Sequence, residues 1–304
     1  MTRYRNLLLF VLLAATWGSA FMAIKAGLAF FPPVLFAAFR YDVAGVLMIG
    51  YAAYAADDWR PRTGPQWAMA LAGGALMIAG YHAFLFVGEQ GTTSAAAAVI
   101  VATSPILTTG FARGLLVGQR LTVAGVAGLL LGLVGVGILV QPDPSNLLTA
   151  AVRSKLLVLA AAVSFAFGSV LTRWIDAPLD IETMQSWSML LGAALMHVVS
   201  VGLGESISAV RWTGTGVAAL LYLSLAASSL GFLIYFDLHD RLGPVEINLV
   251  SYVAPVFAAL SGFLFLGEVI DAVTVTGFLV IVAGFALLKR RELAEELPRL
   301  AAVR

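Results

Sequence analysis

The stretch that decides the fold is residues 121–140, LTVAGVAGLLLGLVGVGILV, where twenty consecutive residues carry no charge. About 20 such residues form a helix long enough to cross the hydrocarbon core of a bilayer. A second run, VTVTGFLVIVAGFALL at residues 273–288, is also uncharged. These two runs predict helices that span a membrane.

The composition of the whole chain agrees with these runs. Of its 304 residues, 61% are hydrophobic and 12% are charged, against about 25% charged in soluble domains. Lipid offers no hydrogen-bond partner to the backbone, so only helices and closed β-barrels can span it. Barrel strands are short and alternate in hydrophobicity, whereas the runs here are long and unbroken. We therefore predict an all-α membrane protein.

The apolar runs predict ten spans, separated by short connections that contain proline, glycine and charged residues. Short loops rich in Lys and Arg stay in the cytoplasm. With the N-terminus inside, thirteen Lys and Arg residues lie on the cytoplasmic side and three lie outside. We therefore predict a multi-pass protein of the cell membrane, with both termini in the cytoplasm. The expected spans are residues 7–30, 34–56, 66–88, 93–112, 121–140, 155–174, 182–203, 214–236, 243–266 and 271–288.

The chain repeats itself at an offset of 150 residues. Trp17-Gly18-Ser19 is matched by Phe167-Gly168-Ser169, and Ser104-Pro105 by Ala254-Pro255. Five spans in each copy is an odd number, so the second copy enters the membrane in the opposite orientation. This 5+5 inverted repeat is an architecture of secondary transporters, which bind substrate between the copies. The expected units are residues 1–145, residues 146–290 and a cytoplasmic tail of residues 291–304.

Five motifs together resemble the EamA-type family of the drug/metabolite transporter superfamily, over residues 7–288. The resemblance implies a cavity lined by spans one to four and six to nine, with spans five and ten peripheral. It also implies export of small metabolites such as amino acids or related solutes. One departure is Gln119, where the family commonly has glutamate, so only Glu268 supplies that acid here. The motifs are Trp17-Gly18-Ser19-Ala20-Phe21…Lys25, Ala38-Phe39-Arg40-Tyr41, Ser104-Pro105, Ala254-Pro255 and Gly267-Glu268.

Three nitrogen-bearing side chains stand at similar depth in the first copy. At about 1.5 Å rise per residue, Arg40 and His82 lie about 7 Å, and Lys25 about 10 Å, outward of their span centres. The second copy has Ile175 and Leu190 at the places of Lys25 and Arg40. An unduplicated basic cluster suits a carboxylate or phosphate, which a guanidinium can bind with two parallel hydrogen bonds. We therefore predict that Arg40 and His82 bind substrate and that Lys25 acts in proton transfer or gating.

Each of these residues also has a structural interpretation. Lys25 can extend its side chain to the outer headgroups, and His82 can hydrogen-bond to a neighbouring helix. Arg40 can belong to a structural ion pair, although Asp42 is poorly placed for it, since residues two apart on a helix point to different sides.

Two glutamates lie near the ends of expected spans. Glu246 is predicted either as a proton or gating site or as a favourable charge at a helix N-terminus. Glu89, at the outer end of the third span, is expected to be solvated.

Four aromatic residues are predicted to line the cavity and to contact substrate: Trp17, Tyr81, Trp187 and Tyr252. Helix packing or a place at the membrane interface is the alternative for each of them.

Two prolines, Pro105 and Pro255, lie at matching positions within expected spans. Proline lacks an N–H group and frees a backbone carbonyl, so it permits a kink. Interrupted helices in both halves point to a transport site and its gates. We therefore predict a gating role for both prolines, with a simple packing kink as the alternative.

The fifth span carries a stripe of small residues, Gly125, Gly128, Gly132 and Gly135. Such stripes allow close helix packing. The packing expected here is either within the repeat or between two copies of the chain, as a homodimer through span five or span ten.

The sequence holds no phosphate-binding loop, His-rich metal spacing, nucleophile elbow or HExxH helix. We predict a transporter rather than an enzyme, with no cofactor and no metal. Its expected partners are a small-molecule substrate and the lipid bilayer, without nucleic acid, and its energy would come from a gradient. The alternative is a membrane-embedded receptor or enzyme that uses the same cavity without translocation.

Overall fold

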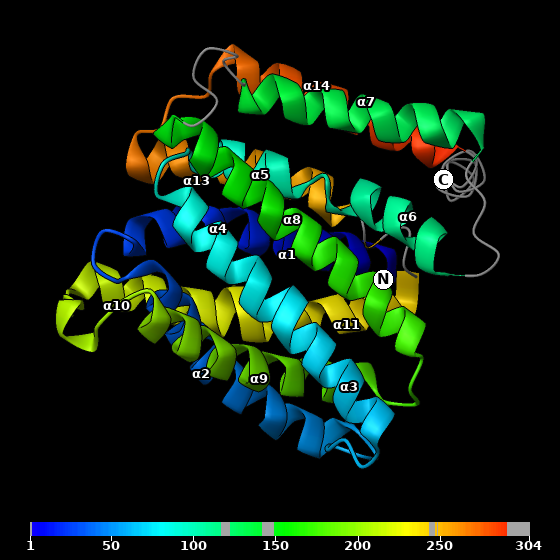
Figure 1. The fold of residues 1–304 in the computed structure, drawn as a ribbon, viewed down its shortest axis with the longest axis vertical. Helices are drawn as coiled ribbons and strands as arrows, with labels where there is room; N and C mark the ends of the chain where they lie inside the picture. Colours follow the sequence, from blue (N-terminus) through cyan, green and yellow to red (C-terminus); the bar gives the residue numbers. More distant parts are fainter. Residues whose placement is uncertain (1, 117–121, 142–148, 243–246, 248, 291–304) are drawn as a thin grey trace.

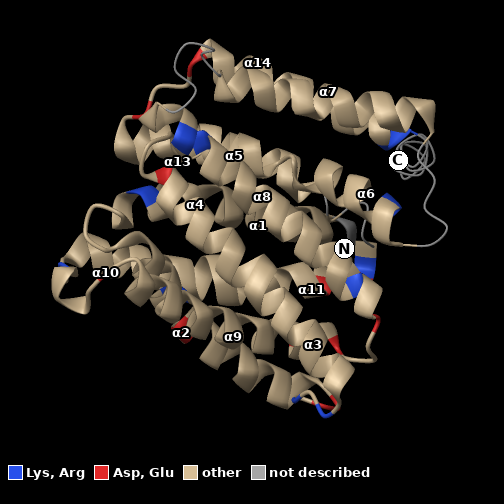
Figure 2. Ribbon diagram, viewed as in Figure 1, with Lys and Arg blue, Asp and Glu red and all other residues tan. Residues whose placement is uncertain are grey.

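The computed structural model describes residues 2–116, 122–141, 149–242, 247 and 249–290. These residues are helical apart from short connections, and no β-strand occurs among them. The helices pack into one bundle (Figure 1), and Lys, Arg, Asp and Glu gather mainly towards the helix ends (Figure 2). The prediction of an all-α membrane protein is confirmed.

Eight helical segments are long and apolar enough to cross a membrane, and two shorter apolar helices follow them in the described chain. The chain is thus a multi-pass membrane protein, while the number of ten spans stays a prediction. The first-half elements are α1 (Thr2–Gly27), α2 (Pro33–Ala55), α3 (Gly64–Ala72), η1 (Gly73–Gly80), α4 (Tyr81–Glu89), α5 (Ser94–Val101), α6 (Ser104–Leu115) and α7 (Val123–Val140). The second-half elements are α8 (Ala150–Ile175), α9 (Ile181–Gly202), η2 (Ile207–Ala209), α10 (Gly214–Leu221), η3 (Tyr222–Leu230), α11 (Gly231–Leu242), α13 (Val250–Leu266) and α14 (Ala272–Leu288).

Side-chain caps fix where several helices begin. The Thr63 hydroxyl accepts from the backbone N–H of Gln66, whose side chain accepts from the backbone of Thr63, so the two form a capping box. Asp271 caps α14 by accepting from the backbone N–H of Thr274. Hydrogen bonds from Thr274 hold the pKa of the Asp271 carboxyl below its usual value. These caps satisfy N–H groups that have no partner within their own helix.

Two spans change from α-helix to π-helix partway along. η1 follows α3 and leads into α4, and η3 follows α10 and leads into α11. The two π-helical segments begin 149 residues apart, which is close to the offset of the sequence repeat. The apolar runs predict both spans as uninterrupted helices, so the two π-helical segments are a finding of the structure. Short π-helical segments are rare and often mark functional sites.

Helices α7 and α14 run side by side along one edge of the bundle (Figure 1). The glycine stripe of α7 faces α14: a Cβ atom on Gly135 would lie 3.0 Å from the carbonyl oxygen of Gly277. Gly128 and Gly135 of the stripe therefore pack against the other half of the same chain, whereas Gly132 also faces the Ile106 side chain of α6 in its own half. A homodimer through α7 or α14 stays a prediction, and it would use other faces of these helices.

This contact predicts that Gly128→Ala destabilises the protein. The added Cβ would lie 2.5 Å from the Gly284 carbonyl oxygen and 2.6 Å from the Leu288 nitrogen, two backbone atoms that cannot rotate away. Overpacking of this kind costs about 1–3 kcal/mol, which thermal unfolding of the purified protein would measure. Gly137→Ala on the same helix is the control, because its Cβ would meet nothing within 4 Å. Equal melting temperatures for the two variants would contradict the contact.

Candidate functional site

A buried polar cluster joins α2, α4 and η3 in the middle of the bundle. Arg40 on α2 is only 6% exposed, and its Nε donates to the hydroxyl of Ser228 on η3 at 2.8 Å. Its guanidinium also lies over the ring of Tyr41, 5.1 Å from the ring centre. Among the described residues Arg40 has no acidic partner, and its two terminal nitrogens make no hydrogen bond. A buried guanidinium in this state can still donate two parallel hydrogen bonds to an anion.

His82 on α4 belongs to the same cluster. Its Nδ1 lies 2.8 Å from the carbonyl oxygen of Ile78, and its Nε2 lies 2.8 Å from the hydroxyl of Tyr41. A carbonyl only accepts, so Nδ1 carries the proton, and in the neutral ring Nε2 accepts from Tyr41. Tyr81 packs edge-on against the His82 ring, with the ring centres 4.5 Å apart. The predicted residues Arg40, Tyr81 and His82 thus come together, with Tyr41 and Ser228 added by the structure.

The two π-helical segments supply carbonyl groups to the opposite half of the chain. Trp17 on α1 donates from Nε1 to the carbonyl of Ala227 in η3 at 3.1 Å, next to the Ser228 that holds Arg40. Ser164 on α8 donates to the carbonyl of Leu76 in η1 at 2.7 Å. In each case the first helix of one half reaches the third span of the other half. Trp17 therefore borders the Arg40 cluster through η3.

Lys25 lies at the end of α4, where it caps the helix. Its Nζ donates to the backbone carbonyls of Glu89, Gln90 and Thr92 at 2.8, 3.1 and 2.8 Å. A cation at a helix C-terminus also interacts favourably with the helix dipole. Both oxygens of the Glu89 side chain are buried, and the residue is 0% exposed. The expectation that Glu89 is solvated was wrong, because α1, α5 and α8 cover this end of α4.

Two predicted aromatic residues lie apart from the Arg40 cluster. Trp187 on α9 donates to the carbonyl of Trp59 and packs against Trp67, so its contacts are with the connection before α3 and with α3 itself. Tyr252 on α13 packs on Phe285 of α14, with the ring centres 4.3 Å apart. The structure therefore does not bring the four aromatic residues into one site.

The two prolines take different positions in their helices. Pro105 lies at the start of α6, just after α5 ends at Val101, so the fourth span is interrupted beside it. The hydroxyls of Thr103 and Ser104 donate to the carbonyls of Ile100 and Val101 at the end of α5. Pro255 lies inside α13, which continues through it. Glu246, the remaining candidate, lies outside the described residues.

Asp42, two residues after Arg40, is bonded to a different helix and not to Arg40. A carboxyl oxygen of Asp42 lies 2.8 Å from the Nε2 of His197 on α9. This contact is a hydrogen bond, and it becomes an ion pair when His197 is protonated. This pair links α2 to α9 and leaves Arg40 without a carboxylate partner among the described residues. No three His, Cys, Asp or Glu side chains in the described ranges come together in a way that could hold a metal ion.

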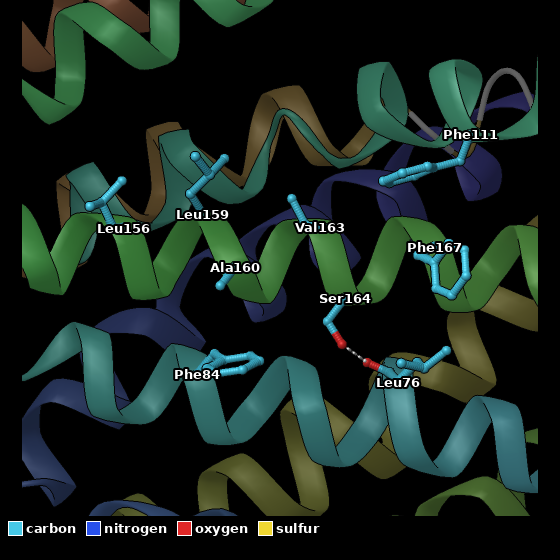
Figure 3. Close-up of a pocket in the computed structure, with 9 residues that line it drawn as sticks. All are labelled: Leu76, Phe84, Phe111, Leu156, Leu159, Ala160, Val163, Ser164 and Phe167. Atoms are coloured by element: carbon cyan, nitrogen blue, oxygen red, sulfur yellow. Dashed lines mark hydrogen bonds between the residues drawn. The ribbon is translucent and has the colours of Figure 1, made fainter. Parts of the chain in front are cut away.

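An apolar groove of about 600 Å³ lies between α8 and the neighbouring η1, α4 and α6. Figure 3 shows Phe84, Phe111 and Phe167 around it, and the Ser164 hydroxyl turned to the carbonyl of Leu76. None of the predicted site residues lines this groove. It does lie next to them, because Tyr81 packs against Phe165 on α8.

Sequence reasoning missed Tyr41 and Ser228. Tyr41 stands inside the Ala38-Phe39-Arg40-Tyr41 motif and directly follows Arg40, so its place in the motif was the available clue. Ser228 had no such clue, because one serine in an apolar helix is common and its partner lies 188 residues away.

The cluster predicts that Tyr41→Phe is destabilising. The change removes the donor to Nε2 of His82 and leaves a buried acceptor without a partner, which costs about 1–3 kcal/mol. Tyr51→Phe on the same helix is the control, because no hydrogen bond of the Tyr51 hydroxyl exists among the described residues. Thermal unfolding should show a lower melting temperature for Tyr41→Phe alone. Unchanged stability would mean that the two side chains are not bonded.

Comparison with known proteins identifies the family. A model described as the EamA-like transporter family matches residues 5–141 and residues 153–290. The chain is 30% identical over 275 residues to "Uncharacterized inner membrane transporter YedA" of Escherichia coli (strain K12), covering 89% of this chain and 87% of YedA. It is 28% identical over 282 residues to "Probable amino-acid metabolite efflux pump" of Salmonella typhimurium (strain LT2), covering 90% of this chain and 91% of the pump.

A solved crystal structure of a protein has the same fold. The match covers 97% of this chain and 99% of the chain in that crystal structure, with a TM-score of 0.66 and 25% sequence identity. Two matches to one family model, which together span most of the sequence, confirm the resemblance seen in the motifs. The chain belongs to the EamA-like transporter family.

Proposed function

We propose that the protein is a secondary transporter that exports small organic metabolites bearing a carboxylate, such as amino acids or related solutes, by alternating access. The observation that carries the substrate class is Arg40: a buried guanidinium with a free fork and no acidic partner among the described residues. A buried charge of this kind in a membrane protein needs an anion or water. The name of the Salmonella relative supports both the amino-acid class and the direction.

The proposed architecture is ten spans in a 5+5 inverted repeat, with units of residues 1–145 and 146–290. It is supported by the double match to one family model, by the paired π-helical segments and by eight long and two shorter apolar helices. Both termini are proposed to be cytoplasmic, on the Lys and Arg distribution. Substrate would bind where η3 of the second half meets α2 and α4 of the first.

Transport itself is tested with purified protein in sealed liposomes. A comparison of metabolites released by cells with and without the protein first selects the solutes to use. Saturable flux of such a solute across the liposome membrane supports the proposal. Binding or chemical turnover without flux would instead favour a receptor or an enzyme.

The topology is tested with single cysteines, for which the chain offers a cysteine-free background. Asp57 and Ile207 are both exposed and lie 150 residues apart, at equivalent places of the two copies. Asp57→Cys should react with an impermeant thiol reagent only after cells are permeabilised, whereas Ile207→Cys should react in intact cells. Reaction of both from the same side would rule out the inverted repeat.

The role of Arg40 is tested by Arg40→Lys and Arg40→Gln. Lysine keeps the charge but cannot form two parallel bonds, so Arg40→Lys should weaken substrate binding by about 1–3 kcal/mol, the range for charge-assisted bonds. Arg40→Gln should weaken it further. Arg211→Lys is the control, since Arg211 is exposed and its side chain donates to the backbone of Ala29.

Affinity and thermal stability are measured together on these three variants. Lower affinity in folded protein supports the binding role of Arg40. Lower melting temperature with unchanged affinity would assign Arg40 to structure alone.

A further inference from the structure

Glu89 is the most deeply buried acidic side chain among the described residues, and the proposed transport site does not use it. It ends α4, it is 0% exposed, and neither carboxyl oxygen has a hydrogen-bond partner in the described part of the chain. The hydroxyls of Thr92 and Ser94 nearby are also buried without a partner. An ionised carboxylate without hydrogen bonds is very costly to bury, whereas its neutral acid is far less so.

The nearby cation does not neutralise this carboxylate directly. The Nζ of Lys25 is bonded to three backbone carbonyls, and no ion pair joins it to the Glu89 side chain in the described structure. The ammonium also occupies the carbonyl oxygens that a sodium ion would need as ligands. A metal cation at this place would lack ligands and would face the charge of Lys25.

The second acid at this end of the bundle is already in use. Both oxygens of Glu268, which follows α13, accept from the backbone N–H of Ser94 at the start of α5, at 3.2 and 3.0 Å. Glu268 therefore caps α5 and ties the α13 side to the α4–α5 connection. Its charge lies close enough to act on Glu89, as do those of Lys25 on α1 and Arg40 on α2.

Helix α8 packs on the other side of α4. A Cβ atom on Gly88 would lie 2.7 Å from the carbonyl oxygen of Ser154, so the turn that carries Arg153 and Lys155 lies beside Glu89. The Nζ of Lys155 donates to the carbonyl of Leu139 on α7 and is thereby turned away. Helix α5 brings no titratable side chain to this place. Glu89 is thus covered by α1, α5 and α8, and its carboxyl group has no hydrogen-bond partner among the residues that the structure describes.

We propose that Glu89 is a proton-binding site whose occupation accompanies closure of this end of the bundle. Closure removes the carboxylate from water, and one proton from the adjoining solution binds to it to give the neutral acid. Opening returns the acid to water, where the proton dissociates. The proposal deepens the proposed function, on which its meaning in a transport cycle rests: one conformational step would respond to pH on the side that this end faces.

Proton binding is measured by infrared spectroscopy of the purified protein during a pH titration. The wild type should show the carbonyl stretch of a protonated carboxylic acid, which decreases as the pH rises. Glu89→Gln should lack this band, and Glu89→Asp should keep one. The control is Glu205→Gln, because Glu205 is a hydrogen-bonded cap that accepts from the backbone of Val34 and Leu35. A wild-type spectrum without a Glu89-dependent band at any pH would overturn the proposal.

Closure is measured by the rate at which a thiol reagent labels Thr92→Cys. Thr92 is 8% exposed, and its hydroxyl makes no hydrogen bond within the described chain. The labelling rate of Thr92→Cys is divided by that of Ile207→Cys, at a 64% exposed position, and the ratio is compared with and without Glu89→Gln, so that the pH dependence of the thiols themselves is common to both measurements. One linked proton allows this ratio to rise by up to about tenfold per pH unit.

The rise should be present with Glu205→Gln and absent with Glu89→Gln. A ratio that ignores pH in the wild type, or that responds to pH equally in Glu89→Gln, would overturn the link between the proton and closure. Neither measurement uses a solute, so the absence of flux in liposomes would count against transport and not against the proton site.

Discussion

The structure depends on how backbone carbonyls are satisfied where lipid offers them nothing. The π-helical segments η1 and η3 loosen the regular hydrogen-bond pattern of two spans, and side chains from the opposite half of the chain bond to the carbonyls there. Unpaired carbonyls in hydrocarbon cost several kcal/mol each, so these bonds tie the halves together at the level of the site. The same loosening of η3 presents the Ser228 hydroxyl to Arg40. The π-helical segment η3 thus provides both a carbonyl that joins the two halves and a hydroxyl that binds Arg40.

Much of this arrangement was readable from the sequence. The uncharged runs predicted the helices, and the family motifs led to Arg40 and its neighbours. Rise along a helix is fixed whatever surrounds it, and it grouped Lys25 with Arg40 and His82. The structure brings Arg40 and His82 together around Tyr41 but places Lys25 at the end of α4. The π-helical segments were missed, since one extra residue per turn leaves no mark on an apolar run. Glu89 was misjudged because its position near a span end says nothing of which helices cover it. Trp187 and Tyr252 were grouped with the site on residue type, which does not fix the direction of a side chain.

The two ends of the bundle differ in how they are held. At one end, Lys25 and Glu268 bond to the backbone around the α4–α5 connection, so two charged side chains from α1 and from beyond α13 meet the same short segment. At the other end the ties include the carbonyl of Asp58, bonded by Thr183, and the pair of Arg5 with Asp237. Exposed ion pairs such as that of Arg5 with Asp237 contribute little to stability, whereas at the Lys25 end one ammonium donates to three backbone carbonyls of the same connection.

The glycine seam between α7 and α14 has a mechanical meaning as well. Its contacts are between backbones, where Gly132 and Gly284 approach without intervening side chains. Interlocked backbones resist sliding, because each turn of one helix is seated against a turn of the other. Since α7 ends the first half of the chain and α14 ends the second, this seam joins the two halves backbone to backbone. A side chain introduced at Gly284 would meet the backbone of Gly128 and Gly132 and push the two halves apart along this edge.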